Sequence, residues 1–190
     1  RVLLILGHPR ADSFCAALAD TYASAATDAG AQVRRVHIGA LDFDPLAVKG
    51  ENDSLEPEAD IRAVQDDIRW AGHLVCVYPI WWGTVPALFK GFLERTFAAG
   101  FAIEFPDKPP YYAPLLNGRS ARLITTMNTP PLIYRWLLRE PGHNVMKRTL
   151  LQLCGIRPVR VTPFGPVRGA SEERRRQWLG KVQRLGRVCA

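Results

Sequence analysis

Five short apolar runs recur along the chain and predict the strands of a sheet. They cover residues 2–6, 32–38, 73–78, 121–126 and 157–164. The first run, "VLLIL", is continuous rather than alternating, which is typical of a strand buried on both faces. The second is rich in β-branched residues, which favour strands. We therefore expect five strands that form the interior of the protein.

Amphipathic stretches separate these runs and predict helices. The clearest lies between Ser13, which suits an N-cap, and Gly30, which suits a helix stop. Within it Phe14, Leu18 and Tyr22 recur at helical spacing. Further helices are predicted over residues 58–70, 85–99 and 144–154 and in the basic C-terminal segment, with a proline-rich loop after the fourth strand.

Strands that alternate with helices predict an α/β fold. We expect a doubly wound five-stranded parallel sheet with right-handed crossovers and helices on both faces, in a single domain over residues 1–190. Ligands of such sheets bind beyond the carboxyl ends of the strands, where the strand order reverses. The loops after strands one, three and four are therefore the candidate functional segments.

Composition narrows the class of protein. The chain is 47% hydrophobic and 23% charged, as in globular proteins. No apolar run reaches the roughly 18–20 residues that span a bilayer, and the start does not resemble a secretory signal. Four scattered cysteines, Cys15, Cys76, Cys154 and Cys189, lack metal-ligand spacing. We therefore expect buried thiols, a cytoplasmic location, no membrane insertion and no metal site.

The positive charge is concentrated at one end. The net charge is +7, and seven basic against two acidic residues follow from Arg168 onward. Trp178, Val182, Leu185 and Cys189 share one face of this predicted helix, so its basic residues form the solvated face. No nucleic-acid recognition motif accompanies the charge, and we expect no nucleic-acid partner.

The first candidate loop, "GHPRADSF", combines His8 with a helix start at Ser13. Free backbone N–H groups at a helix N-terminus, with a hydroxyl and an imidazole, make a natural phosphate site. The loop has neither the Walker pattern nor the Gly-x-Gly-x-x-Gly of dinucleotide-binding folds. Ser13 would also cap the helix without any ligand, so the signal is weak alone.

The second loop, "PIWWGTV", places two tryptophans directly after a core strand. Trp81 and Trp82 must be covered either by protein or by a flat ligand. Gly83 favours a ligand because its backbone can approach a ring system closely. Pro79 ends the strand and stiffens the turn, and a planar cofactor could accept hydrogen bonds from the N–H groups of residues 81–83.

The third loop, "TTMNTPPLIY", brings polar groups to the same edge. Thr126, Met127 and Asn128 could hold the polar edge of such a cofactor. Tyr134 and His143 lie beyond them, and each could donate a proton; the alternative is that both are ordinary buried groups with structural partners. A flavin fits the three loops, with its phosphate in the first and its isoalloxazine on the tryptophan turn.

These stretches, together with "LDFDPL", "LCGIRPV" and "FGPV", resemble the flavodoxin-like NAD(P)H:quinone oxidoreductase family. The turn and helix from Pro79 to Gly91 is the most specific match. The resemblance implies a flavin phosphate site, an isoalloxazine site and a third loop on the other side of the flavin. The implied phosphate site comprises His8, Ser13, Phe14 and Cys15. The implied isoalloxazine site comprises Pro79, Ile80, Trp81, Trp82 and Gly83. The third loop contributes Thr126, Met127 and Asn128.

The resemblance also implies a homodimer, in which aromatic residues such as Tyr111 and Tyr112 cross to the partner's site. Cys15 stands where well-known members carry Asn, and "TTMN" replaces a Thr-Thr-Gly-Gly turn. The chain lacks the longer C-terminal region of mammalian members, which favours FMN, with FAD as the alternative.

The implied activity is transfer of two electrons from NAD(P)H through the flavin to a quinone-like acceptor, by ping-pong kinetics. Tyr134 and His143 are the implied proton donors. Two other functions stay open: a flavodoxin-type electron carrier, and a flavin-binding regulatory subunit of a potassium-efflux channel.

Overall fold

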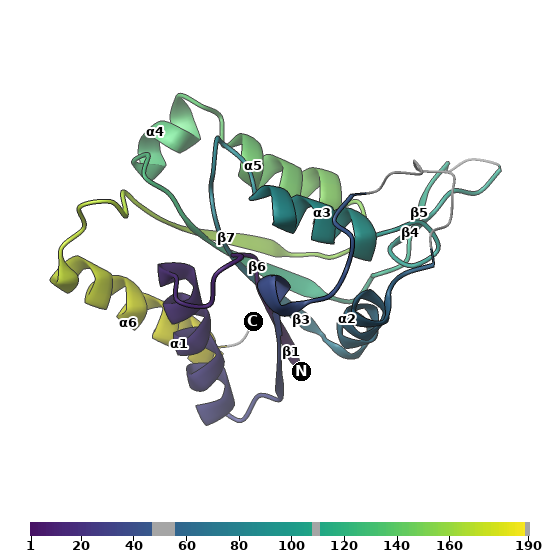
Figure 1. Cartoon of the computed structure of the whole chain (residues 1–190), viewed down its shortest axis with the longest axis horizontal. Helices are drawn as coiled ribbons and strands as arrows, with labels where there is room; N and C mark the ends of the chain where they lie inside the picture. The colour runs from purple at the N-terminus through teal and green to yellow at the C-terminus, as the bar shows by residue number, and fades with distance from the viewer. Residues whose placement is uncertain (47–55, 108–110, 189–190) are drawn as a thin grey trace.

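A five-stranded parallel sheet forms the centre of the computed structural model, which describes residues 1–46, 56–107 and 111–188 (Figure 1). Its strand order is β2-β1-β3-β6-β7. The strands are β2 (Val33–His37), β1 (Val2–Leu6), β3 (His73–Pro79), β6 (Ser120–Thr126) and β7 (Val159–Phe164). The prediction of a doubly wound parallel sheet is confirmed.

The strand order reverses at β1, which lies between β2 and β3. Leu6, the last residue of β1, is in register with His37 of β2 and with Val77 of β3. The connections from β1 lead to one side of the sheet and those from β3 to the other, which leaves a crevice at their carboxyl ends. The first and third candidate strands therefore end beside each other, as the sequence predicted.

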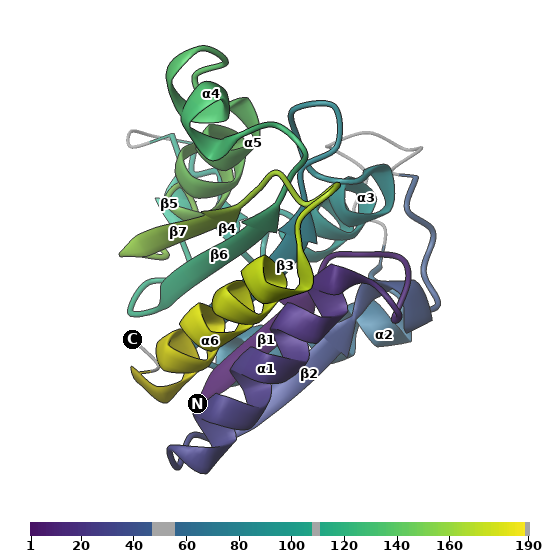
Figure 2. The ribbon, with the colours of Figure 1, turned by 90° about the vertical axis from the view of Figure 1, so that its left-hand side faces the viewer.

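Helices cover both faces of the sheet. Helices α1 (Phe14–Asp28) and α6 (Glu172–Val188) pack side by side on one face (Figure 2). Helices α2 (Ala59–Trp70) and α3 (Ala87–Thr96) and the π-helical segment η2 (Val145–Leu151) cover the other. Strand residues alternate between the two cores: Leu4 packs with the α1 and α6 side chains, and Leu3 with the other group.

The ends of α1 show why the sequence signals were informative. The Oγ atom of Ser13 accepts a hydrogen bond from the N–H of Ala16 at 3.2 Å, which satisfies one of the free donors of the first turn. At the other end, Gly30 has a φ of +88°. The N–H of Ala31 donates to the carbonyl of Ala26 there, so Gly30 stops the helix in the way expected of glycine.

The C-terminal helix buries the predicted apolar face. Trp178 and Val182 are buried against α1, while most of the basic side chains of α6 are exposed. Gly186 packs so closely on α1 that an added Cβ would lie 2.6 Å from the carbonyl oxygen of Tyr22. Cys15, Cys76 and Cys154 are buried free thiols, as predicted, and Cys189 lies outside the described residues.

Several elements differ from the prediction. The expected loop after β6 contains a short helix, α4 (Pro131–Trp136), because a proline at the first helical position starts a helix rather than breaking it. The expected helix over 144–154 starts earlier, as α5 (Pro141–Asn144), and continues as η2. The expected helix over 85–99 is shortened to α3, which begins after Pro86 at its N-cap and ends at Thr96. The smaller elements are η1 (Ile38–Ala40), β4 (Ile103–Glu104) and β5 (Ala113–Pro114).

Within the described ranges, no helix combines the length and apolar character needed to span a lipid bilayer.

Candidate cofactor site

A hollow of about 200 Å³ opens at the carboxyl ends of β1, β3 and β6. Its wall is made by residues of four loops: His8, Ser13, Phe14, Cys15, Pro79, Ile80, Trp81, Thr126, Met127, Asn128 and Val167. The three loops singled out in the sequence therefore meet at one place. Of the residues predicted to contact a cofactor, only Trp82 and Gly83 are absent from this wall.

The first loop supplies hydrogen-bond donors at the start of α1. Ser13 caps the helix, and among the hydrogen bonds of the described residues none uses the N–H of Phe14 or of Cys15. Both N–H groups belong to the first turn of a 15-residue helix, where the helix dipole favours negative charge. Because Ser13 and Phe14 also line the hollow, this end of the site can hold a phosphate group.

His8 adds a neutral imidazole to the same end. Its Nδ1 atom lies 3.0 Å from the backbone nitrogen of Arg10 and 3.2 Å from the carbonyl oxygen of the same residue, so the Arg10 backbone can pair with either tautomer of the neutral ring. Burial lowers the pKa of His8 below its usual value, so the ring is neutral at physiological pH. The ring meets the indole of Trp81 edge-on, with centroids 5.5 Å apart. His8 therefore connects the phosphate-capable loop with the tryptophan turn.

Cys15 joins the first loop to the third. Its Sγ atom lies 3.2 Å from the Oγ1 atom of Thr126, in hydrogen-bond contact. Burial raises the pKa of the Cys15 thiol to about 12, so the group stays protonated. A protonated buried thiol is a poor nucleophile. Cys15 thus acts here as a small contact between two loops that line the hollow.

The tryptophan turn is a tight two-residue hairpin. Trp81 and Thr84 exchange both backbone hydrogen bonds, at 2.9 and 3.0 Å. The two residues between them have positive φ angles, +51° at Trp82 and +82° at Gly83, which define a type I′ turn. Trp82 is strained in this conformation because it carries a side chain. The backbone of the turn therefore has a defined conformation at both tryptophans.

Neither indole is sealed beneath neighbouring side chains. Trp81 is 45% exposed and lines the hollow, while Trp82 is fully exposed and is not one of the wall residues. One expectation needs correction: the N–H of Trp81 is not available to a ligand, because it donates to the carbonyl of Thr84. The N–H groups of Trp82 and Gly83 have no partner among the described residues, so they are the donors that this turn can offer.

The third loop is fixed by its neighbours on both sides. The carbonyl of Thr126 accepts from the N–H of Ile80 at 2.7 Å, and the carbonyl of Met127 accepts from the N–H of Val167 at 3.0 Å. The side-chain oxygen of Asn128 accepts from the N–H of Arg168. With that oxygen occupied, the amide nitrogen of Asn128 is the group that can donate to a ligand in the hollow.

Val167 is the wall residue that the sequence reasoning missed. It follows β7, in the stretch "FGPV", and the N–H of Val167 pairs with Met127. Gly165 permits this close approach, since a Cβ there would lie 2.8 Å from the carbonyl oxygen of Met127. The position of β7 beside β6 could have indicated that its carboxyl end reaches the same edge.

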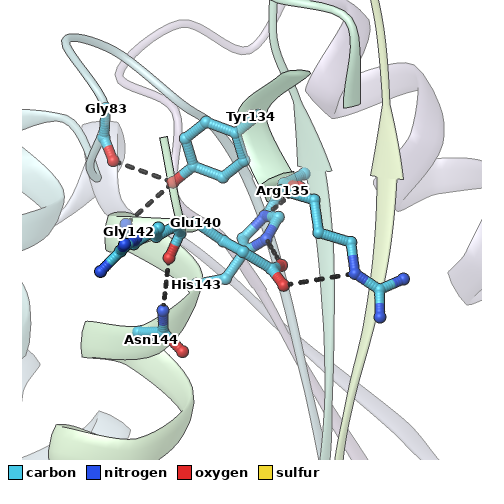
Figure 3. Close-up of polar contacts among 9 residues, drawn as sticks. Gly83, Tyr134, Arg135, Glu140, Gly142, His143 and Asn144 are labelled. Atoms are coloured by element: carbon cyan, nitrogen blue, oxygen red, sulfur yellow. Dashed lines mark hydrogen bonds and ion pairs between the residues drawn. The ribbon is translucent and has the colours of Figure 1, made fainter. Parts of the chain in front are cut away.

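Tyr134 is not one of the wall residues of the hollow, and its hydroxyl faces Gly83 of the tryptophan turn (Figure 3). Its hydroxyl donates to the carbonyl oxygen of Gly83 at 2.9 Å and accepts from the N–H of Gly142 at 2.8 Å. Burial raises the pKa of the Tyr134 phenol. The phenol therefore stays protonated and links α4 to the turn between β3 and α3.

His143 is buried next to Tyr134, with ring centroids 5.0 Å apart. Its Nδ1 atom lies 3.0 Å from Oε2 of Glu140, and its Nε2 atom lies 2.9 Å from Oγ1 of Thr125. Burial lowers the pKa of His143, and the carboxylate of Glu140 opposes this effect. Both ring nitrogens thus have partners inside the protein, and His143 does not line the hollow.

Tyr111 and Tyr112 do not approach the hollow of their own chain. They precede β5, and both are exposed. The β4–β5 pair lies at the opposite end of the molecule from α4 (Figure 1).

Fold and site together define a doubly wound α/β protein with a phosphate-capable, aromatic-edged crevice at its switch point. A family model described as a flavodoxin-like fold matches residues 1–185. The chain belongs to this flavodoxin-like family, and the resemblance predicted from its sequence motifs is confirmed.

Similar proteins carry consistent names. The chain is 26% identical over 182 residues to a protein of Haemophilus influenzae named as an uncharacterized NAD(P)H oxidoreductase, covering 93% of this chain and 89% of that protein. It is 24% identical to human ribosyldihydronicotinamide dehydrogenase (quinone), covering 97% and 90% of the two chains. Among solved structures, Smu.1420 of Streptococcus mutans superposes with a TM-score of 0.84 at 29% identity, covering 98% of each chain.

Proposed function

We propose that this chain is a flavin-dependent oxidoreductase that passes two electrons from NAD(P)H to a quinone-like acceptor. The observation that carries the proposal is the convergence of a phosphate-capable helix start and a half-exposed indole on one hollow. The names of the relatives, NAD(P)H oxidoreductase and ribosyldihydronicotinamide dehydrogenase (quinone), support the same class of reaction.

The wall residues fit a phosphorylated planar cofactor. Ser13, His8 and the N–H groups of Phe14 and Cys15 would hold the phosphate. Ile80 and Trp81 supply apolar surface for a ring system, and Asn128 supplies an amide donor. The hollow contains one helix start and thus one phosphate-binding set, which favours FMN over FAD.

When bound, the flavin supplies the redox chemistry by accepting hydride from NAD(P)H and passing two electrons on. The protein contributes orientation and charge stabilisation. The N–H groups of Trp82 and Gly83 would stabilise negative charge on the cofactor ring. NAD(P)H and the acceptor would use the hollow in turn, which corresponds to ping-pong kinetics.

Neither candidate proton donor lines the hollow, and of the two it is Tyr134 whose hydroxyl bonds to the tryptophan turn. The N–H of Gly142 lies 2.9 Å from the carbonyl oxygen of Gly83, as well as 2.8 Å from the Tyr134 hydroxyl. If the hydroxyl turned away from Gly83 to donate to an acceptor, that carbonyl would keep one hydrogen bond. His143 has both nitrogens bonded internally, so its role would be to support Tyr134.

We further propose that two copies of the chain associate around this site. Helix α4 and the residues after it expose five large apolar side chains, called here the α4 patch: Leu132, Ile133, Trp136, Leu137 and Leu138. Trp136 is 74% exposed and Leu137 is 75% exposed. Exposed apolar surface of this kind marks interaction sites. Tyr134 of α4 bonds to the tryptophan turn, and we propose that a partner on this patch also covers Trp82 and brings its tyrosines to the site.

A visible spectrum of the purified protein, followed by anaerobic titration with NADH and then NADPH, tests the proposed activity. We expect a flavin spectrum, or its appearance on adding FMN, and bleaching by at least one nicotinamide. Steady NAD(P)H oxidation with menadione and no partner reductase would separate this enzyme from a one-electron carrier. Protein that stays colourless with both FMN and FAD would contradict the proposal.

A further inference from the structure

The junction between α4 and α5 holds two consecutive strained residues. Arg139 and Glu140 have φ angles of +58° and +47°, a left-handed conformation that side chains disfavour. Hydrogen bonds hold this conformation on both sides. The N–H of Glu140 donates to the carbonyl of Tyr134 at 2.9 Å, and the Nδ2 atom of Asn144 donates to the carbonyl of Arg139 at 2.7 Å. Strain that is held in this way beside a candidate site suggests a function.

The strained backbone turns the Glu140 carboxylate toward His143 (Figure 3). One oxygen, Oε2, lies 3.0 Å from Nδ1 of the imidazole. The other oxygen, Oε1, lies 3.7 Å from Nε of Arg135, in an ion pair. The carboxylate side chain is 33% exposed, whereas the imidazole is almost fully buried. Glu140 therefore reaches inward from the surface and meets the buried ring.

This contact determines which nitrogen of His143 carries the proton. An ionised carboxylate can only accept, so Nδ1 must carry the hydrogen. The hydroxyl of Thr125 faces Nε2 at 2.9 Å, and a hydroxyl can either donate or accept. Glu140 is thus a hydrogen-bond acceptor for His143, and Thr125 is a partner that can either donate or accept. The opposite tautomer would place the Nδ1 lone pair against the carboxylate oxygen, where the two would repel.

In the part of the chain that the structure describes, the ionisable side chains in contact with His143 or Glu140 do not compete with this arrangement. Tyr134 packs edge-on against the imidazole, and its hydroxyl is bonded to Gly83 and Gly142 instead. The guanidinium of Arg135 pairs with Glu140. On the sheet side, the bonded partner is the uncharged Thr125.

We propose that Glu140 is a positioning residue, which fixes His143 as the Nδ1–H tautomer and so keeps the imidazole, Gly142 and the Tyr134 hydroxyl in one arrangement behind the tryptophan turn. This inference deepens the proposed function, since the value of the arrangement for turnover rests on Tyr134 as a proton donor. It assigns to His143 a supporting role: its proton points toward Glu140, and its Nε2 accepts from Thr125.

The tautomer can be measured without cofactor or activity. Two-dimensional ¹H–¹⁵N spectra of the protein, labelled with ¹⁵N-histidine and free of flavin, report which nitrogen is protonated. The spectrum of His143→Gln assigns the signals among the four histidines. At pH 7 we expect the His143 proton on Nδ1 in the wild type and in Glu140→Gln, whose amide oxygen still accepts. In Glu140→Ala we expect the Nε2–H form to become populated, because Thr125 is then the acceptor that remains for the ring among the described residues.

Turnover provides the second readout. With flavin bound, we expect Glu140→Ala to lower kcat with a quinone by about tenfold, with the flavin affinity unchanged and with rescue by Glu140→Gln. Glu94→Gln, which removes an exposed carboxylate of α3, is the matched control and should change neither readout.

A wild-type spectrum with the proton on Nε2, or an unchanged tautomer in Glu140→Ala, would overturn the inference. The wild-type spectrum decides the question even if Glu140→Ala does not fold. A protein that shows the Nδ1–H form and binds no flavin would instead refute the proposed function and leave the role of Glu140 on the tautomer standing.

Discussion

The hydroxyl of Tyr134 donates a hydrogen bond to the carbonyl oxygen of Gly83, 51 residues earlier in the chain and 2.9 Å away. This bond ties the helix that follows β6 to the turn that follows β3. The N–H of Gly142 contacts both oxygen atoms. The direction of the tryptophan turn therefore depends on a segment that does not itself line the hollow.

Replacing Tyr134 by Phe removes the hydroxyl and keeps the buried ring. We expect a loss of about 1 kcal/mol in the free energy of unfolding, the typical net value of one hydrogen bond. Turnover with a quinone should fall by about a hundredfold if the phenol donates the proton, while the dissociation constant of FMN stays within a factor of about two because the wall of the hollow is intact. Steady-state kinetics and fluorescence titration measure these quantities, and wild-type turnover in the variant would exclude Tyr134 as donor.

Gly142 should not tolerate a side chain. A Cβ there would lie 2.8 Å from the carbonyl oxygen of Gly83 and 2.9 Å from the Tyr134 hydroxyl. Gly142→Ala is expected to cost about 2–3 kcal/mol of unfolding free energy by overpacking. In Gly180→Ala, within α6, a Cβ meets only the end of the Arg184 side chain at 3.9 Å. That control should stabilise the protein by about 0.5–1 kcal/mol in urea unfolding; equal effects of the two substitutions would contradict the close contact at Gly142.

Substitutions of Trp81 and Trp82 should have different effects, the first on cofactor binding and the second on self-association. Trp81→Ala removes a wall residue and is expected to weaken FMN binding by about three- to tenfold, in line with the size of a stacked aromatic contact. Trp82→Ala should change FMN affinity less. If the second copy covers Trp82 as proposed, this variant should raise the dissociation constant of the dimer in sedimentation velocity, as should Trp136→Ser. Wild-type protein that sediments as a monomer at all concentrations would contradict the proposed dimer.

His73 should make stability depend on pH below neutrality. Burial lowers the pKa of this histidine to about 4, and Arg122 and Arg160 add to the effect. The folded state favours the neutral ring, so as pH falls below about 6.5 the unfolded state takes up the proton first and stability declines until about pH 4. The loss attributable to His73 is of the order of 3 kcal/mol. Urea unfolding at pH 7 and 4.5 should show a smaller decline in His73→Gln; an identical decline would place the effect elsewhere.

The sheet and most of the wall residues were predictable because each rests on a local signal. Apolar runs identified the strands, and Ser13 and Gly30 marked the two ends of α1 through capping chemistry. Once the strands were known, the switch-point rule placed their loops at one edge. The wall residues other than Val167 could then be predicted without knowledge of contacts between distant segments.

What the sequence did not predict depends on contacts between distant segments. Pro131 reads as a loop residue but opens α4, where it is compatible with the first helical turn. Trp82, Arg139 and Glu140 adopt left-handed angles, which no propensity favours and which surrounding hydrogen bonds impose. The hydrogen bond between Glu140 and His143 depends on that backbone geometry. The fact that the two residues are three positions apart in the sequence was therefore not enough to predict it.

The most direct measurement for the central claim is titration of the flavin-free protein with FMN, followed by its fluorescence and visible absorption. The account predicts quenching with one FMN per chain and a clear weakening in Trp81→Ala, whose indole forms part of the hollow. Absence of saturable binding by FMN and by FAD would contradict the assignment of the hollow as a flavin site.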